Sequence, residues 1–335
     1  MTLQTYFNKS NKLWQFWIDR GGTFTDIVAK RPDGQILIHK LLSENPEQYQ
    51  DAPVQGIREV MGIPDNVPIP ADKIEVVKMG TTVATNALLE RKGDRTVLVI
   101  TKGFGDALRI GYQNRPDIFA REIILPEMLY EQVIEVEERY NAQGEELIPV
   151  NKQQVQKDLE TAYETGIRSC AIVLMHGYRY TGHEQEIVNI AKIIGFEQIS
   201  VSHKVSPLMK LVSRGDTTVV DAYLSPILSR YVDQVSAQLS GNIETYLTKN
   251  ISKIQTKDKN KTAFYEIINK AKSPKLMFMH SNGGLADANL FHGKDSILSG
   301  PAGGIVGAVK TSEIAGLQKI IGFDMGGTST SRTKP

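Results

Sequence analysis

Two acids, two hydroxyls and a pair of glycines lie together in one short segment near the start of the chain. An apolar run ends at Asp19, and residues 19–26 read DRGGTFTD. Because glycine has no Cβ, backbone N–H groups beside it can approach a bulky anion closely. Threonine hydroxyls can donate to phosphate oxygens, and carboxylates can hold Mg²⁺ directly or through water. The segment predicts a phosphate-binding turn between two strands, although an ordinary Gly-Gly hairpin has the same local pattern. The candidate residues are Gly21, Gly22, Thr23 and Thr25 for phosphate, and Asp19 and Asp26 for the metal.

A second copy of this pattern lies near the other end of the chain. An apolar stretch leads to Asp324, and residues 324–330 read DMGGTST, so both copies share the spacing Asp-x-Gly-Gly-Thr-x-Thr. Two copies, each after a predicted strand, indicate two related domains that bind one nucleotide between them. Asp324 is the expected support for Mg²⁺ or for a water molecule. The candidate phosphate-binding residues of this copy are Gly326, Gly327, Thr328 and Thr330.

A third polar segment, GTTVATN at residues 80–86, begins a predicted helix. Asn86 lies one helical turn after Thr82, which places both side chains on one face of that helix. Hydroxyls and an amide at a helix start suit a small polar substrate or a phosphate group. Thr81, Thr82 and Asn86 are therefore the candidate substrate residues. Ordinary helix capping by Thr81 or Thr82 explains the same pattern.

The segment SGPAGG, residues 299–304, precedes an apolar helix expected at residues 305–315. Ser299 is expected to cap this helix, with Pro301 in its first turn. The free N–H groups and the positive dipole end of such a helix attract anions, so Gly300 and Gly303 are candidate nucleotide-binding residues. The alternative is a glycine-rich turn that allows close helix packing.

Three other polar residues have the residue types of a metal site, and the single cysteine could be a reactive thiol. His176, His183 and Glu184 suggest a metal pair, but their spacing is not that of a zinc site and no cysteine pair accompanies them. We interpret Glu184 as a first-turn helix acid and His176 as a strand-end residue. Cys170 lies in a continuous apolar strand, which favours a core residue over a reactive thiol.

These candidate residues require a framework of strands and helices. Apolar runs and turn signals predict three successive antiparallel strands within residues 14–41. A strand at 74–78, a helix at 82–91 and a strand at 96–100 predict a crossover unit in one mixed sheet. Further helices are predicted at residues 51–61, 152–165, 180–195 (capped by Thr181) and 208–239 (interrupted near Gly215), and further strands at residues 132–140, 170–175, 199–202 and 276–279. Residues 280–284 form a turn at the carboxyl end of the last strand, where ligands bind in open α/β sheets.

Composition excludes several classes of function. The chain has 335 residues, with 39 lysines and arginines against 38 aspartates and glutamates, so its net charge is +1. A nearly neutral chain gives no electrostatic support for nucleic-acid or membrane binding. One cysteine fits a reducing cytoplasm, and no apolar run approaches the ~20 residues that span a bilayer. The lysine-rich residues 240–275 are interpreted as a solvated loop, with a basic binding patch as the alternative.

Four segments together resemble the hydantoinase A/oxoprolinase family: residues 19–26, 79–93, 299–304 and 322–330. Within the family, residues 40–51 (KLLSENPEQYQD), followed by Ala52 and Pro53, are similar to the ATP-hydrolysing oxoprolinases. The similarity runs from about residue 13 to residue 330. In the family the last motif continues with Asp-Val and a long further chain, whereas Ser331 stands in place of that acid here.

The resemblance implies an α/β chain with the actin-like (ribonuclease H-like) ATPase fold and a truncated second domain. The implied organisation is a disordered tail at residues 1–12, an amino-terminal actin-like domain at 13–210, and the incomplete start of a hydantoinase A domain at 211–335. We therefore expect the front portion of a longer cytoplasmic enzyme. Its expected partner is the missing carboxyl-terminal part as a separate chain, or a second copy of this chain.

The implied activity is opening of 5-oxo-L-proline, a small cyclic amide, to L-glutamate with ATP and Mg²⁺. Transfer of the γ-phosphoryl group to the lactam oxygen would create a leaving group for attack by water, with the protein supplying positioning and charge stabilisation. The alternatives within the family are an N-methylhydantoin hydrolase or a ketone carboxylase subunit. A hypothesis of another class is an inactive fragment that binds nucleotide weakly or not at all.

Overall fold

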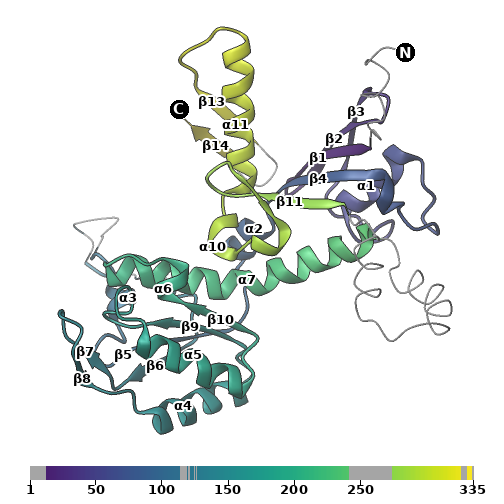
Figure 1. Ribbon diagram of the computed structural model, residues 1–335. Coiled ribbons are helices and arrows are strands. Elements are labelled where there is room, and N and C mark those ends of the chain that lie inside the picture. The colour runs from purple at the N-terminus through teal and green to yellow at the C-terminus, as the bar shows by residue number, and fades with distance from the viewer. Residues whose placement is uncertain are drawn as a thin grey trace, which may run out of the picture. The chain divides into compact units, whose positions relative to one another are not determined.

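The computed structural model describes residues 13–113, 119, 121–123, 125, 127–240, 274–325 and 330–333 (Figure 1). The expected tail at residues 1–12, nearly all of the lysine-rich stretch, and Gly326, Gly327 and Thr328 lie outside these residues. The chain divides into two compact units, each described by itself below. The first comprises Met1–Thr82, Arg230–Phe291 and Leu298–Pro335, and the second comprises Val83–Ser229 and His292–Ile297.

The two units interleave along the sequence, so they cut across the expected segments 13–210 and 211–335. The first unit is assembled from distant parts of the chain because its parallel strands come from both ends of it. Helix α7 (Leu211–Leu239) contributes residues to both units. This helix runs without interruption through Gly215, so the predicted break there is wrong. A Cβ on Gly215 would lie 2.5 Å from Leu108 Cδ2, so this glycine allows close packing.

A six-stranded mixed sheet forms the first unit, in the order β12-β11-β4-β1-β2-β3. Its strands are β1 (Trp14–Arg20), β2 (Phe24–Lys30), β3 (Ile36–Leu42), β4 (Ile74–Thr81), β11 (Lys275–Met279) and β12 (Leu285–Asp287). The three antiparallel strands predicted within residues 14–41 are confirmed. β4 is parallel to β1, and β11 is parallel to β4. The carboxyl ends of β1, β4 and β11 therefore meet at one edge of the sheet.

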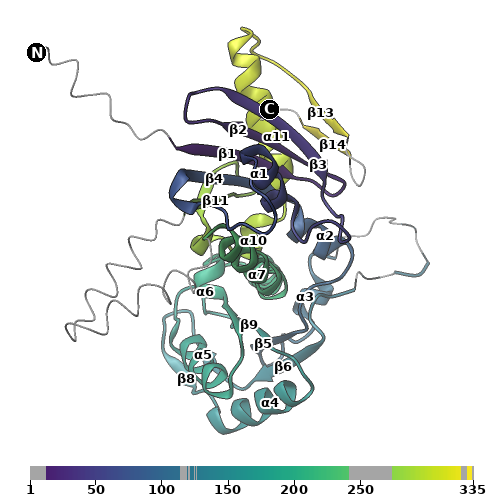
Figure 2. The same ribbon diagram turned by 90° about the vertical axis from the view of Figure 1, so that its right-hand side faces the viewer.

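Helices cover the two faces of this sheet (Figure 2). α1 (Ala52–Met61) is capped by Asp51, and a Cβ on Gly56 of α1 would meet Ile27 Cδ1, so α1 packs directly on β2. α11 (Ser299–Ile314) approaches the opposite face, where a Cβ on Gly303 would lie 3.8 Å from Met279 Cε. A hairpin of β13 (Gly322–Met325) and β14 (Thr330–Thr333) follows α11. The short helices of this unit are η2 (Ala71–Lys73) and η3 (Ala288–Leu290).

A four-stranded parallel sheet forms the second unit, in the order β10-β9-β5-β6. Its strands are β5 (Thr96–Thr101), β6 (Gln132–Val136), β9 (Ser169–Val173) and β10 (Gln198–Val201), with a small separate hairpin of β7 (Arg139–Tyr140) and β8 (Glu146–Ile148). α4 (Lys152–Glu164) and α5 (Gly182–Ile194) share one core cluster with the sheet, and α3 (Ala107–Ile110) and α7 share another. The remaining helices are α2 (Val83–Leu89), α6 (Ser202–Val205) and α10 (Gly293–Ser296).

The predicted crossover unit around residues 74–100 is wrong. β4 belongs to the six-stranded sheet and β5 to the four-stranded sheet. Both edges of β4 are occupied by β1 and β11, so β5 has no edge of β4 to pair with. The strand predicted at 132–140 is likewise divided into β6 and β7.

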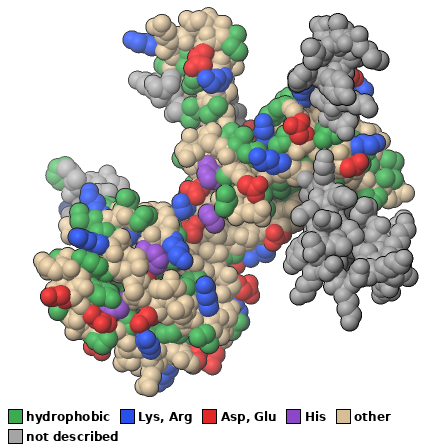
Figure 3. Space-filling view, viewed as in Figure 1, with side chains coloured by type: hydrophobic (Ala, Val, Ile, Leu, Met, Phe, Trp, Pro, Cys, Tyr) green, Lys and Arg blue, Asp and Glu red, His purple; other side chains and the backbone are tan. Residues whose placement is uncertain are grey.

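Cys170 lies in β9 with 0% of its surface exposed, which confirms it as a core residue. Burial raises the pKa of its thiol, so the reactive thiolate is disfavoured. Lysine, arginine and acidic side chains are interspersed on the face shown in the space-filling view (Figure 3), in keeping with the net charge of +1. Among the described residues, no helix is both long and apolar enough to cross a membrane.

Candidate functional site

Three of the predicted segments converge at the carboxyl edge of the first unit's sheet. Asp19 lies near the end of β1, and Gly80 and Thr81 end β4 beside it. The register pairs Asp19 with Gly80 and Arg20 with Thr81. The first residues of α11 contact the same place, so DRGGTFTD, GTT and SGPAGG meet within one unit. The edge where parallel strands end is the usual place for a ligand in an open α/β sheet.

The Asp19 carboxylate faces two glycines. A Cβ on Gly80 would lie 3.2 Å from Asp19 Oδ1, and a Cβ on Gly300 would lie 3.9 Å from the same oxygen. A Cβ on Gly300 would also lie 3.3 Å from Thr82 Cγ2. These glycines therefore leave room beside an exposed carboxylate. Oxygen ligands of this kind suit Mg²⁺, which keeps several of its waters when it binds protein.

Two threonines of the GTT segment are tied to the neighbouring segments by hydrogen bonds. The Thr81 amide donates to Ser299 Oγ at 3.3 Å. The Thr82 amide and the Thr82 hydroxyl both donate to the Arg20 carbonyl, each at 3.2 Å. Both threonines thus fasten the site together. Asn86, the third predicted substrate residue, lies in α2 of the second unit.

The glycine-rich segment differs from the prediction in one respect. α11 begins at Ser299, and Leu298 occupies the N-cap position without a side-chain capping bond. The expectation that Ser299 caps the helix is wrong, because its hydroxyl accepts the Thr81 amide instead. Pro301 lies in the first turn, as predicted. Gly300 faces Asp19, whereas Gly303 packs against Met279 of β11.

The β1–β2 turn depends on its first glycine and on a buried hydroxyl. The Gly21 amide donates to Phe24 O at 3.1 Å, and a Cβ on Gly21 would lie only 2.9 Å from that oxygen. Thr25 is 0% exposed, and its hydroxyl pairs with Ser43 Oγ at 3.0 Å. Ser43 in turn donates to Gly21 O at 2.7 Å. Thr25 therefore stabilises the turn from the face of the sheet opposite Asp19. The predicted contact between the Thr25 hydroxyl and a phosphate is not made from this buried position.

The second predicted metal ligand is engaged elsewhere on the same face. Asp26 lies directly across from Asp19 in the β1–β2 register. Its carboxylate binds Lys40 Nζ at 2.9 and 3.0 Å. Asp19 is thus the carboxylate that lies among the glycines, and Asp26 is a neighbour neutralised by a lysine.

The strands that flank the second copy of the motif pair in the same register as those that flank the first. β13 and β14 form an antiparallel hairpin in which Asp324 lies across from Ser331, as Asp19 lies across from Asp26. Ser331 therefore occupies the position that corresponds to Asp26. Thr330 begins β14.

Sequence reasoning missed two contributors to the first unit's site. Ser281, in the turn after β11, accepts the Leu298 amide at 3.0 Å and so holds the start of α11. Arg20 supplies the carbonyl that holds Thr82. The sequence predicts a turn at a ligand-binding edge for residues 280–284, but it does not indicate which residue that turn contacts.

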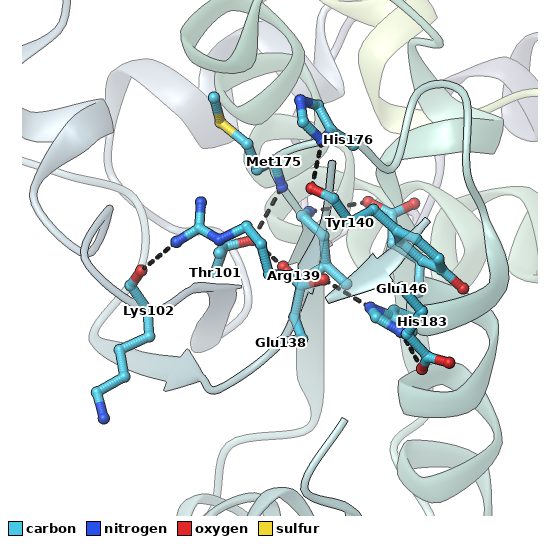
Figure 4. A network of polar contacts seen from close by, with 11 residues as sticks. Thr101, Lys102, Glu138, Arg139, Tyr140, Glu146, Met175, His176 and His183 are labelled. Carbon is cyan, nitrogen blue, oxygen red and sulfur yellow. Dashed lines mark hydrogen bonds and ion pairs between the residues drawn. The ribbon is translucent and has the colours of Figure 1, made fainter. Parts of the chain in front are cut away.

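The suggested metal pair is a hydrogen-bonded network in the second unit (Figure 4). His183 is 2% exposed, with Nδ1 2.6 Å from Glu138 Oε2 and Nε2 2.9 Å from Glu146 Oε1. The Thr101 hydroxyl donates to Glu138 and accepts the Met175 amide at 2.9 Å. Within the described residues no group of three or more His, Cys, Asp or Glu could hold a metal ion.

The acid and the cap predicted for α5 are both in place. Glu184 lies in the first turn of α5, as predicted, but it is fully buried and accepts bonds from Leu174 N, Ser202 Oγ and the His203 amide. His176 Nδ1 lies 2.9 Å from Tyr140 O, beyond the end of β9. Thr181 occupies the N-cap position of α5, but its side chain makes no capping bond.

Comparisons with known proteins identify the family of the chain. Residues 15–195 match the family described as Hydantoinase/oxoprolinase N-terminal region, and residues 214–332 match Hydantoinase/oxoprolinase. 5-Oxoprolinase 1 of Arabidopsis thaliana is 42% identical over 94% of this chain, and 5-oxoprolinase of Dictyostelium discoideum is 38% identical over 96% of it. The chain spans only about a quarter of the length of these relatives (25% and 27%).

A solved structure supports the fold. The crystal structure of the ATP-dependent caprolactamase from Pseudomonas jessenii matches 96% of this chain and 43% of its own chain, with a TM-score of 0.70 and 24% identity. At that identity the likeness concerns the mixed α/β fold alone. Together with the two family matches, which cover most of the sequence, it leads to one conclusion. The chain belongs to the hydantoinase/oxoprolinase family.

Proposed function

We propose that this chain is the nucleotide-binding front portion of an ATP-dependent cyclic amide hydrolase that opens 5-oxo-L-proline to L-glutamate. The observation that carries the proposal is the convergence of Asp19, Gly80 and Gly300 at one edge of the first unit's sheet. The relatives named 5-oxoprolinase support the choice of substrate. We also propose the actin-like fold for this nucleotide-binding portion, with residues 13–210 and 211–335 as the family's two domains.

The roles of the residues follow from their positions. Asp19 holds Mg²⁺ or orients the attacking water, because its carboxylate is exposed and borders two glycines. The amide of Gly22 and the hydroxyl of Thr23 bind phosphate oxygens at the turn. Gly21 serves the turn itself, because its amide donates to Phe24 O and a Cβ would not fit there. Bound Mg²⁺ would neutralise charge on the phosphates. We propose the corresponding roles for Asp324, Gly326, Gly327, Thr328 and Thr330 in the second copy.

Phosphorylation of the lactam oxygen moves the γ-phosphoryl group from ATP to the substrate and releases ADP. Water then adds to the activated carbon and the ring C–N bond breaks, which frees the amine and leaves an acyl phosphate. A second water hydrolyses this acyl phosphate, so that L-glutamate and phosphate are formed. The protein contributes position and charge stabilisation. We propose Thr82 as a residue near the substrate, and Asn86 remains a substrate candidate in the second unit. Thr81 is 0% exposed, so its role is to hold the start of α11 through Ser299.

The test is Asp19→Ala in the full-length protein that carries these residues, assayed for ATP cleavage with 5-oxo-L-proline. We expect cleavage to fall by about a hundredfold or more with an unchanged circular dichroism spectrum. Asp26→Asn is the matched control and should retain most activity, because Asp26 is already paired with Lys40. Near-normal turnover of Asp19→Ala would remove Asp19 from the mechanism. Equal stimulation by acetone plus bicarbonate, or by hydantoins alone, would overturn the substrate.

A second candidate is that residues 1–335 are inactive by themselves, since they span 25% of the length of 5-oxoprolinase 1 of Arabidopsis thaliana. Adenine contacts supply much of nucleotide affinity through apolar burial, and we propose that they lie in polypeptide outside these residues, on the same or a separate chain. Purified residues 1–335 should then form no measurable glutamate from 5-oxo-L-proline and MgATP. Robust turnover by residues 1–335 alone would exclude this candidate and show that the further polypeptide is dispensable.

A further inference from the structure

Arg20 and Asp19 are neighbours in β1 whose side chains point to opposite faces of the sheet. Asp19 pairs across the sheet with exposed Asp26, on the face of Gly80 and Gly300, whereas Arg20 pairs with buried Thr25. The Arg20 side chain therefore lies beneath the site. Its only role in phosphate chemistry would be indirect, through the backbone that it holds.

On the underside of the sheet, the half-buried Arg20 side chain lies against an aromatic ring. Arg20 Cζ lies 5.4 Å from the centroid of the Tyr231 ring, within the range of a cation–π contact. Tyr231 is 9% exposed and packs edge-on against Phe278 of β11. Arg20 Nε is buried and has no hydrogen-bond partner among the described residues. The Tyr231 ring is therefore a packing surface for this side chain.

A buried carboxylate complements the ring. Asp51, 5% exposed, caps α1 by accepting the Val54 amide at 3.1 Å. Burial raises the pKa of Asp51, and the Val54 hydrogen bond and the Arg20 charge act in the opposite direction. Arg20 thus interacts electrostatically with the start of α1 as well as with α7.

The backbone carbonyl of Arg20 contacts the GTT segment at the end of β4. This carbonyl accepts both the amide and the hydroxyl of Thr82, each at 3.2 Å. One residue therefore joins the β1–β2 turn, the end of β4, and the underside packing of α1 and α7. A shift of the Arg20 side chain would move the carbonyl and the adjacent Asp19 together.

We propose that Arg20 is a positioning residue, whose side chain, packed on the Tyr231 ring, fixes Thr82 and the Asp19 carboxylate at the phosphate-binding edge. Any effect of Arg20 on turnover rests on the proposed function. The positioning of Thr82 and Asp19 by Arg20 is independent of that function, and it can be measured without nucleotide.

The experiment is amide hydrogen exchange on the 335-residue chain, read by mass spectrometry. Arg20→Met keeps the apolar stem and removes the guanidinium, and Tyr231→Leu removes the ring. We expect exchange about tenfold faster at residues 21–23 and 81–83 in both variants, with α1 and β9 as protected as in the parent chain. Tyr231→Phe is the matched control, because it keeps the ring face, and should exchange like the parent.

Two results would overturn the proposal. One is unchanged exchange at residues 21–23 and 81–83 in both variants. The other is faster exchange spread over the whole first-unit sheet, which is the result of a merely structural role. Should Arg20→Met fail to fold, the Tyr231→Leu and Tyr231→Phe pair decides the question. Absence of ATP cleavage in the full-length protein would count against the proposed function and leave these exchange results standing.

Discussion

The Thr81 amide donates a hydrogen bond to Ser299 Oγ across 218 residues of sequence. Both residues are 0% exposed, so the bond lies in the interior of the first unit. It joins the carboxyl end of β4 to the first residue of α11, and it therefore sets where Gly300 lies relative to Asp19. A helix start that is fixed to the sheet in this way presents its first turn at the edge where β1 and β4 end.

Ser299→Ala should destabilise the first unit, because it removes the acceptor of a buried amide. We expect a loss of about 1–2 kcal/mol in the free energy of unfolding. Ser312→Ala, in the same helix, is the matched control and should change it by less than about 0.5 kcal/mol. Urea denaturation of both variants measures the difference. Equal stability of the two variants would show that the Thr81–Ser299 bond contributes nothing net.

Gly80→Ala should impair the site while leaving the fold in place. A Cβ at this position would lie 3.2 Å from Asp19 Oδ1 and push the carboxylate from its place. We expect ATP cleavage by the full-length protein to fall about tenfold or more, since small displacements of catalytic groups are costly.

Gly304→Ala is the control for this change, because a Cβ on Gly304 meets nothing within 4 Å. Replacing glycine by alanine inside α11 should preserve cleavage and stabilise the helix by up to about 1 kcal/mol. Parallel assays of cleavage and thermal unfolding on the two variants separate the local clash from a general effect of added methyl groups. Full activity of Gly80→Ala would show that the space beside Asp19 is not used.

Motif chemistry predicted the residues of the site better than it predicted their contacts. The motifs predicted Asp19 and Gly300 as site residues, and the structure brings both together with Gly80, which the prediction did not include. The side of the sheet on which Thr25 lies depends on strand alternation from Arg20. The sequence contains this alternation, because it follows from the strand period of two residues. The prediction that the Thr25 hydroxyl binds phosphate used only the residue type.

Long-range pairing could not be derived from the sequence. Local pattern gave β4 and β5 correctly as strands, but the sheet to which each belongs is decided by β11, nearly two hundred residues after β4. The sequence also does not reveal that His183 is a buried hydrogen-bonding residue. Its partners are Glu138, just after β6, and Glu146, in the β7–β8 hairpin. Contacts between distant segments have no local periodicity to reveal them.

His183→Ala should destabilise the second unit strongly. Both ring nitrogens of His183 face carboxylate oxygens, and Glu138 is itself 4% exposed. Removing the ring takes the His183 partner from the buried Glu138 carboxylate, which keeps only its bond from the Thr101 hydroxyl within the described part of the chain. Loss of one partner of a buried charge typically costs about 3 kcal/mol or more. His39→Gln is the control, because the His39–Glu59 pair is largely exposed and should change stability by about 1 kcal/mol or less. Similar losses in urea denaturation for both variants would contradict a structural role for the buried network.

Asp51→Asn should remove a pH-dependent component of stability. Burial raises the folded-state pKa of Asp51 above its ordinary value of 3.8. The folded chain then binds the proton more tightly than the unfolded chain, so this group's contribution is favourable below 3.8 and is lost as the pH rises through the folded pKa. Asparagine stays neutral and can still accept the Val54 amide as an N-cap.

The free energy of unfolding of Asp51→Asn, relative to the parent chain, should therefore increase between pH 3 and pH 7. Asp65→Asn, at an exposed acid, is the matched control. A difference that is flat across this range, or that moves the other way, would mean that the Val54 bond and Arg20 outweigh burial at Asp51.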